Sequence, residues 1–277
     1  MSAVPLRRLR PTRGWVALDL HEIVEFRDLV LEFARRDIKL RYRQTILGIA
    51  WVVIQPLVAA GVLNFAFGIV AGARPQGRSY FLFTFAGVLA WNLFSWTLNK
   101  SSLSLVGNSY LISKVYFPRL ILPLSGTLST LLDFGVSLVV LLVMQVLYGV
   151  VPGWGVLLLP VWVALILTLA LGAGFIAAAL TVDYRDIQHI LPILIPFMLY
   201  ASPVAYEVSQ IPVGYQQLFY LVNPLAALVV AFRASLVPGA AMPPAVYLAW
   251  SVSVAVALFV AGAAVFKRTE RKVADVI

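Results

Sequence analysis

Residues Ala34–Pro56 read ARRDIKLRYRQTILGIAWVVIQP, and this stretch passes directly from basic to apolar sequence. It is apolar from Ile46 onward. Basic side chains can lie among anionic lipid head groups while the apolar run that follows enters hydrocarbon. The stretch therefore predicts the point at which the chain first enters a membrane. The basic half contains Arg35, Arg36, Lys39, Arg41 and Arg43.

The preceding segment has the periodicity of an amphipathic helix over residues 22–43. At about 100° per residue, one face is apolar and the opposite face is charged, although Asp37 interrupts the apolar face. Because a hydrophobic run follows directly, we expect an interface helix along the membrane surface. A helix packed on a soluble partner would show the same pattern. The apolar face comprises Ile23, Phe26, Leu29, Val30, Phe33 and Leu40.

The composition is that of a polytopic membrane protein. Of the 277 residues, 61% are hydrophobic and 12% are charged, whereas soluble domains have about 25% charged residues. The net charge of +9 does not indicate nucleic-acid binding, because Lys and Arg lie at the ends of hydrophobic runs, as topology signals do. The chain has no cysteine. It therefore offers no thiolate ligand, and we expect no metal site.

Six hydrophobic runs are candidates for membrane-spanning helices, so the expected fold is an all-α polytopic membrane domain. The fifth run, residues 190–204, is short for a span of about 20 residues. It contains three prolines, Pro192, Pro196 and Pro203. Residues 218–237 are apolar but broken at Asn223–Pro224. They either cross as a seventh span or belong to a re-entrant hairpin at about 205–237. The six runs cover residues 46–72, 80–104, 120–148, 155–181, 190–204 and 245–266.

Positive charge favours six spans with both termini in the cytoplasm. With six, the outside holds only Arg74, Arg78 and Arg233, whereas a seventh span would place the basic C-terminal cluster outside. The predicted organisation is then complete. It comprises a cytoplasmic tail (1–21), an interface helix (22–43), a transmembrane domain (44–266) with an extracytoplasmic re-entrant hairpin at about 205–237, and a second cytoplasmic tail (267–277).

No constellation of residues predicts catalysis. His21 and His189 lie outside the predicted spans, and no Walker A pattern is present. If the protein pumps, ATP and Mg are expected on a separate ATPase chain, with no cofactor in this one. Asp133 is the acidic residue that stands out within the spans, and an intramembrane charge is a functional candidate by default. The structural alternative is a hydrogen bond with Ser129 or Ser137.

Residues 106–119, VGNSYLISKVYFPR, mix polar and large apolar side chains between the second and third spans. On the six-span topology this segment is cytoplasmic. Exposed aromatic side chains on a short helix need a partner surface. The segment therefore either packs against the chain's own bundle or docks into a groove of a motor subunit.

Six motifs follow one another along the chain. RRDIKLRYRQTILGIAWVVIQP precedes FAGVLAWNLF (85–94), NSYLISKVYFPRLILPL (108–124), DYRDI (183–187), ASPVAY (201–206) and LVNPLAAL (221–228). None is specific alone. Together and in this order, from about residue 25 to 266, they resemble the permease subunit of ABC-2 type transporters that export polysaccharides such as O-antigen, capsule or teichoic acid.

The resemblance implies an assembly and a substrate. Two permease copies would form the channel as a homodimer in the bacterial cytoplasmic (inner) membrane, and two nucleotide-binding ATPase subunits would dock below. The substrate would be an O-antigen-like glycan on a polyprenyl diphosphate carrier. Residues at about 107–117 would be the coupling helix to the ATPase. The coupling residues would be Asn108, Tyr110, Leu111, Ile112, Lys114, Tyr116 and Phe117.

Such a substrate would need aromatic rings and cations. Sugars stack on aromatic rings, and the basic residues at 35–43 suit a diphosphate. Lipid anchoring and positive-inside topology would favour the same residues. An ABC-2 permease for teichoic acid, capsule, lipid or a drug, or a proton-coupled secondary transporter using Asp133, are the alternative functions. The aromatic residues expected along the glycan path are Trp51, Phe65, Phe67, Phe197 and Tyr200.

Overall fold

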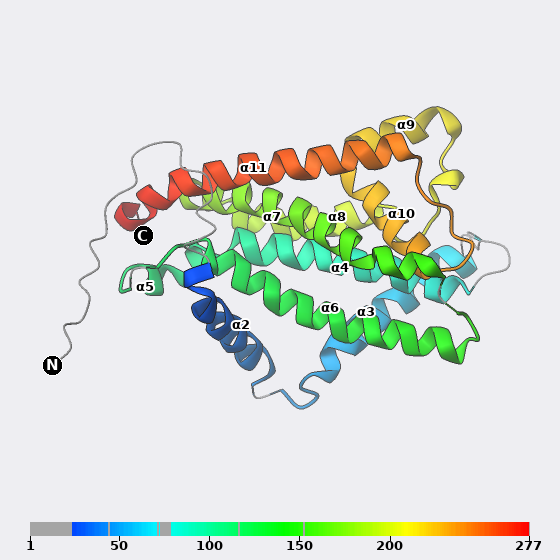
Figure 1. Cartoon of the computed structure of the whole chain (residues 1–277), viewed down its shortest axis with the longest axis horizontal. Helices are drawn as coiled ribbons and strands as arrows, with labels where there is room; N and C mark the ends of the chain where they lie inside the picture. The colour runs from blue at the N-terminus through cyan, green and yellow to red at the C-terminus, as the bar shows by residue number, and fades with distance from the viewer. Residues whose placement is uncertain are drawn as a thin grey trace.

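The computed structural model describes residues 24–43, 45–70, 72, 79–115, 117–151 and 153–276, with side chains up to residue 270. Within these residues the chain is helical and contains no strand (Figure 1), which confirms the expected all-α class. The predicted N-terminal tail, the loop with Arg74 and Arg78, and Tyr116 lie outside the described residues.

Five of the described helices are long and apolar enough to cross a membrane, and each coincides with a predicted span. One predicted boundary differs, because the last helix continues well beyond residue 266 into the expected C-terminal tail. The five are α3 (Ala50–Leu63) with its π-helical continuation η1 (Asn64–Val70), α4 (Tyr80–Ser102), α6 (Ile121–Leu147), η3 (Trp154–Leu158) with α7 (Leu159–Asp183), and α11 (Ala245–Val276).

The region between α7 and α11 consists of shorter helices. α8 (Ile187–Tyr200) has 14 residues, about 21 Å of helix, and is too short to cross about 30 Å of hydrocarbon alone. η4 (Val208–Gln210) leads to α9 (Val213–Val222) and α10 (Pro224–Leu236), which are bent by 102° at the break between them. This bend fits a re-entrant hairpin, and the count of six spans stays a prediction.

Helix α4 forms the centre of the bundle. It lies between α6 and α7 in Figure 1. In an apolar stretch of 18 residues of α4, 83% of the residues are buried, compared with 22–39% in the corresponding stretches of the other four candidate spans. Its sequence fits this position, because its mean hydropathy of 1.5 is the lowest of the five, which range up to 2.5, and polar side chains in a span face other helices rather than lipid. The other spans leave apolar side chains exposed, as a surface in contact with lipid requires.

The ASPVAY segment is fastened to α10 by a buried arginine. Arg233 is 2% exposed, donates a 2.8 Å hydrogen bond to the Pro203 carbonyl oxygen and lies 3.7 Å from the centroid of the Phe83 ring. Arg233 is therefore not an extracytoplasmic surface charge, as the topology count assumed, because its guanidinium is needed inside the protein. Removing Arg233 from that count leaves fewer positive charges on the predicted outside.

The ASPVAY and LVNPLAAL motifs meet in the same place. Asn223 caps α10 by accepting from the Leu225 backbone N–H at 3.1 Å, and it donates 2.9 Å hydrogen bonds to the Ala201 carbonyl and to Ser202 Oγ. Gly87 of α4 faces the same segment so closely that a Cβ there would lie 2.3 Å from the Val204 carbonyl oxygen. Small size at Gly87 allows this contact.

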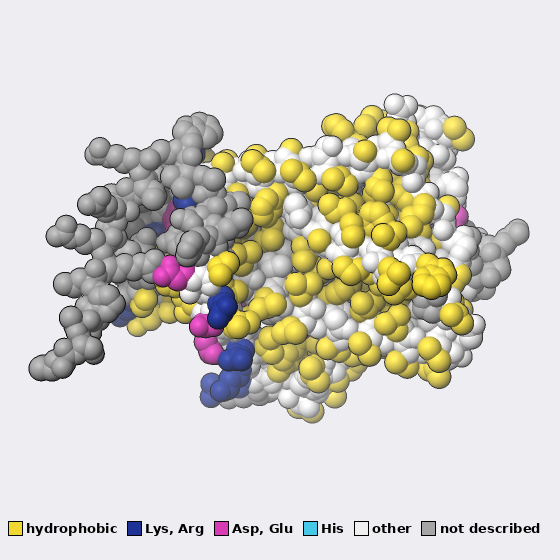
Figure 2. All heavy atoms as spheres, viewed as in Figure 1, with side chains coloured by type: hydrophobic (Ala, Val, Ile, Leu, Met, Phe, Trp, Pro, Cys, Tyr) yellow, Lys and Arg dark blue, Asp and Glu magenta, His cyan; other side chains and the backbone are white. Residues whose placement is uncertain are grey.

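The charged side chains gather towards one end of the molecule. α2 (Arg27–Tyr42) begins at the end that also holds η2 (Val106–Asn108), α5 (Ser109–Ile112) and the C-terminal end of α11 (Figure 1). On the face drawn in Figure 2, most of the Lys, Arg, Asp and Glu side chains lie at the end that holds α2, and apolar side chains are spread over the rest of the described surface. The Arg119 backbone N–H donates to Glu270 at 3.2 Å, which fastens the start of α6 to α11.

Candidate functional site

The predicted coupling segment is only partly helical. The expected helix over 107–117 consists of the short turn η2 and the four-residue α5, followed by turns at Ser113 and Lys114. The Asn108 side chain donates a 2.9 Å hydrogen bond to the carbonyl of Ser104, in the turn that follows α4. The segment is therefore a compact helical corner that is continuous with the central helix.

This corner shares a small hydrophobic core with α2. The Phe33 and Phe117 rings pack edge to face with centroids 5.5 Å apart. Arg36 donates a 2.9 Å hydrogen bond to Asn108 Oδ1. The expected apolar face of the interface helix thus packs on the predicted coupling segment. The shared cluster contains Phe117, Ile121 and Leu122, with Phe26, Leu29, Val30, Phe33, Leu111 and Ile112 against it.

The seven predicted coupling residues separate into inward and outward groups. Tyr110 is 69% exposed, and the Lys114 ammonium lies 4.6 Å from its ring centroid. Phe117 is buried, while Leu111 and Ile112 are partly buried against the α2 core. Tyr110 and Lys114 are therefore the predicted residues that a docking partner could contact, and Tyr116 lies outside the described residues.

The five predicted phosphate ligands do not form one site. Arg35 pairs with Glu32 at 2.7 Å, and Arg36 pairs with Asp37 at 3.2 Å. Lys39 and Arg43 are exposed on α2 and beyond its end. Arg41 instead points into the molecule. The distribution follows from helical periodicity, because five bases over nine residues cannot share one face.

Arg41 forms an ion pair with Asp133, whose side chain is 5% exposed. The Tyr42 hydroxyl donates to the other carboxylate oxygen at 2.8 Å. Burial, followed by the hydrogen bond to Asp133, raises the pKa of Tyr42 to about 12, so this hydroxyl remains a donor at neutral pH. Ser129 and Ser137 are not the partners of Asp133, because they donate to the carbonyls of Gly126 and Val52.

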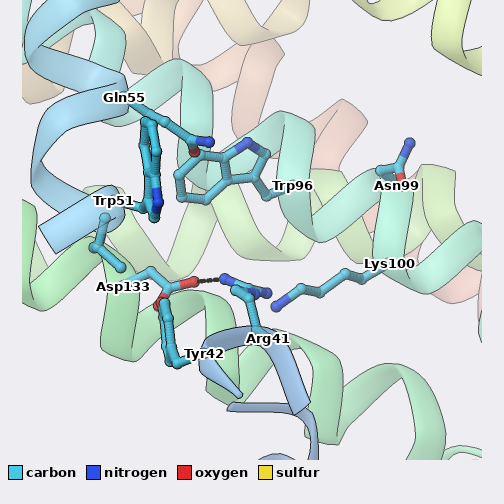
Figure 3. A pocket seen from close by; sticks show the side chains of 9 residues that line it. Arg41, Tyr42, Trp51, Gln55, Trp96, Asn99, Lys100 and Asp133 are labelled. Atoms are coloured by element: carbon cyan, nitrogen blue, oxygen red, sulfur yellow. Dashed lines mark hydrogen bonds and ion pairs between the residues drawn. The ribbon is translucent and has the colours of Figure 1, made fainter. Parts of the chain in front are cut away.

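A cavity of about 490 Å³ lies beside this ion pair, between α2, α3, α4 and α6. Lys100 reaches into it from α4, towards the Arg41 guanidinium (Figure 3). The sequence prediction missed Lys100, although an ionisable residue inside a predicted span was the available signal. The lining residues are Arg41, Tyr42, Trp51, Val52, Gln55, Trp96, Asn99, Lys100 and Asp133.

The predicted glycan-path aromatics occupy different environments. Trp51 lines the cavity, while Phe65, Phe197 and Tyr200 are exposed on α3–η1 and α8. Phe67 packs on the core with its ring centroid 6.3 Å from that of Tyr206. The five residues therefore do not line one continuous path within a single copy of the chain.

Known proteins similar to this chain are membrane transport proteins. The profile of the family described as ABC-2 type transporter matches residues 29–237. The chain is 31% identical over 259 residues to the O-antigen export system permease protein RfbA of Myxococcus xanthus, which covers 93% of this chain and 98% of that protein. Identity to a Klebsiella pneumoniae protein of the same name is 27% over 90% of this chain and 95% of the relative. The polysialic acid transport protein KpsM of Escherichia coli is 24% identical over 74% of this chain and 79% of its own length.

Proposed function

Because the chain belongs to the ABC-2 type transporter family, we propose that it is the permease of an ATP-driven exporter of O-antigen-like polysaccharide. The glycan crosses the bacterial cytoplasmic membrane on a polyprenyl diphosphate carrier. The permease works as a homodimer with two separate ATPase subunits, which bind ATP and Mg. Both termini of the permease are cytoplasmic.

The observation that carries this proposal is the full-length similarity to an O-antigen export permease, at 31% identity over 98% of that protein. The matched residues include the predicted coupling segment, the 201–206 segment and the predicted hairpin. The similarity is therefore not limited to the long apolar helices, which many membrane proteins have. Another polysaccharide, such as a capsule, is the nearest alternative substrate, because the chain is also similar to a polysialic acid transport protein. That protein matches less of the chain, so O-antigen-like polysaccharide is favoured.

The described contacts offer a route from an ATPase to the membrane helices. An ATPase that binds the corner around Tyr110 would move α5, and α2 would follow because Phe33 and Asn108 hold it to that corner. At its other end α2 is held to α6 through Arg41 and Asp133. A displacement at the docking surface is thereby transmitted along α2 into the bundle.

The test is co-expression of the chain with the ATP-binding subunit of its own exporter, followed by purification and measurement of ATPase activity. We expect a complex with two copies of each subunit. Tyr110→Asp should prevent the ATPase from co-purifying, because an exposed aromatic contact becomes a desolvated charge. A permease that purifies alone, and whose cells still export the glycan, contradicts the proposal.

The matched control is Tyr148→Asp. Tyr148 is 56% exposed and caps the opposite end of α6 from the coupling corner. It should leave the complex intact. Ile112→Asp is unsuitable as a docking variant, because Ile112 packs in the core shared with α2, and its loss would disturb the fold rather than the contact.

A further inference from the structure

Resting on the proposed function, we propose that the cavity between α2, α3, α4 and α6 is a binding site for a sugar phosphate. The phosphate lies between Arg41 and Lys100, and the sugar that bears it lies against Trp51 and Trp96. The site would receive the phosphorylated end of the glycan, and it makes Lys100, Trp96 and Gln55 specificity-determining residues.

The charges in the cavity favour an anion. Arg41 and Lys100 approach from different helices with their head groups facing one another (Figure 3), and Asp133 pairs with Arg41 alone. The described partners of the Lys100 ammonium are neutral oxygens, namely Ser129 Oγ and the Gly126 carbonyl. No ion pair among the described residues includes Lys100.

An ammonium removed from water with no carboxylate in direct contact is costly, because the desolvation penalty is several kcal/mol per ion. Two converging cations add repulsion to that penalty. A phosphate between them would remove both costs, and guanidinium and ammonium groups are the side chains that bind phosphate most readily. The cavity therefore has a net positive charge, whereas Arg35 and Arg36 are each neutralised by a neighbouring carboxylate.

The remaining lining residues favour a sugar rather than phosphate alone. Trp51 and Trp96 flank the cavity above the ion pair, with the Gln55 amide beside them (Figure 3). Indole faces stack on the C–H faces of sugar rings, and an amide both donates to and accepts from hydroxyl groups. The volume of about 490 Å³ lies within the usual range for small-molecule sites, about 300–1,000 Å³. It accommodates one or two sugar residues and not a polymer.

The cavity can be reached without opening the bundle. The Arg41 side chain is 35% exposed and Trp51 is 42% exposed, so the side between α2 and the start of α3 faces outward. A ligand can enter there with any lipid chain left outside. The same geometry admits a free sugar phosphate, so the chemistry leaves two sources to be separated by experiment.

The experiment measures binding to the full chain in lipid nanodiscs, with its ATPase subunits where they co-purify. Three probes are compared by tryptophan fluorescence and by calorimetry: farnesyl diphosphate N-acetylglucosamine, farnesyl diphosphate, and N-acetylglucosamine 1-phosphate. We expect the first to bind most tightly. Comparable binding of the third would identify free sugar phosphate as the ligand of the same site.

Variants separate the two halves of the site. Lys100→Gln should weaken binding of the first probe at least about tenfold, as loss of a charge-assisted contact does, whereas Lys100→Arg should restore it to within about threefold. Trp96→Leu should weaken binding of the sugar-bearing probe about three- to tenfold and leave that of farnesyl diphosphate unchanged. The control is Arg27→Gln, on the exposed surface of α2, which should have no effect.

Unchanged binding in Lys100→Gln, or an equal loss in Arg27→Gln, overturns the assignment of the cavity. Equal binding of farnesyl diphosphate with and without the sugar, unaffected by Trp96→Leu, also overturns it, because the cavity would then hold a phosphate or lipid head group only. In each case the proposed function survives if the complex still exports polysaccharide. Absence of both export and binding of any probe defeats both proposals.

Discussion

The carboxylate of Asp133 is held by two consecutive residues of one helix, Arg41 and Tyr42. Consecutive side chains on a helix point about 100° apart, so both reach the same carboxylate only where the end of α2 lies across α6. The two contacts therefore determine the position of the end of α2 and its rotation. Asp133 is thus explained by its partners on α2.

Removing both partners of the ion pair should cost less than the sum of the costs of removing each one alone. Arg41→Gln leaves a buried carboxylate with the Tyr42 hydroxyl alone, and should lower the free energy of unfolding by about 1–3 kcal/mol. The double variant Arg41→Gln with Asp133→Asn should be more stable than the sum of the two single variants predicts, because no unpaired charge remains. Thermal unfolding in detergent measures this.

The control for that series is Arg35→Gln, whose ion pair with Glu32 is exposed on both sides. Its effect should stay within about 0.5 kcal/mol. Strict additivity of the Arg41 and Asp133 substitutions would show that the pair does not hold α2 to α6.

Among the elements, α4 has contacts on all sides and the least tolerance for added volume. Gly87 touches the 201–206 segment, and Gly174 of α7 faces α4 so closely that a Cβ would lie 2.5 Å from Ser101 Cβ. Interiors packed this densely respond to single methyl groups. The position of the hairpin, which rests on α4, therefore depends on these contacts.

Gly87→Ala should destabilise the protein by about 1–3 kcal/mol, because its Cβ would collide with the Val204 backbone oxygen, which no side-chain rotation can relieve. Gly135→Ala is the matched control on α6, where a Cβ meets no atom within 4 Å. It should be neutral or slightly stabilising, since alanine favours helix by about 1 kcal/mol over glycine. Equal effects in thermal unfolding would contradict the packing.

The contact between α2 and α5 leads to a separate prediction about transmission. Phe33→Ala removes the ring that packs on Phe117 but leaves Tyr110 exposed for docking. We expect the ATPase to remain bound while glycan export falls several-fold. Leu31→Ala, at an exposed position of the same helix, should leave export unchanged. Loss of ATPase binding in Phe33→Ala would show instead that α2 belongs to the docking surface.

For the whole molecule, the prediction to test is which side of the membrane each end of the helical bundle faces. Because the chain has no cysteine, single cysteines report sidedness without background. Ser113→Cys, at the coupling corner, should react with a membrane-impermeant maleimide only after the membrane is opened. Ser209→Cys, exposed at η4, should react in intact spheroplasts. The reverse pattern would place α5 and both termini outside and refute the proposed topology.

The sequence predicted the long elements well and the site poorly. The spans were found because runs of about 20 apolar residues have few alternatives. The cavity was missed because its residues come from four helices, so no spacing connects Arg41, Trp51, Lys100 and Asp133. Arg233 was placed on the surface because charge counting assumes that a base is solvated, and only the fold shows the carbonyls that it satisfies. The segment at 107–117 was singled out by its composition, and its coupling role stays a prediction. Its division into inward and outward residues required the packing on α2.

Helix α8 has an unusual need for water. Its prolines at 192 and 196 have no N–H, so the carbonyls of Gln188 and Pro192 lack their usual helical donors. In hydrocarbon an acceptor without a donor is costly, whereas a hydrated passage satisfies it without any side chain. The same helix exposes apolar side chains, including Phe197 and Tyr200. α8 is therefore suited to a position in which water hydrates the free carbonyls on one side and the apolar side chains face away from that water. A polar polymer could move along the hydrated side by exchanging hydrogen bonds with the water there.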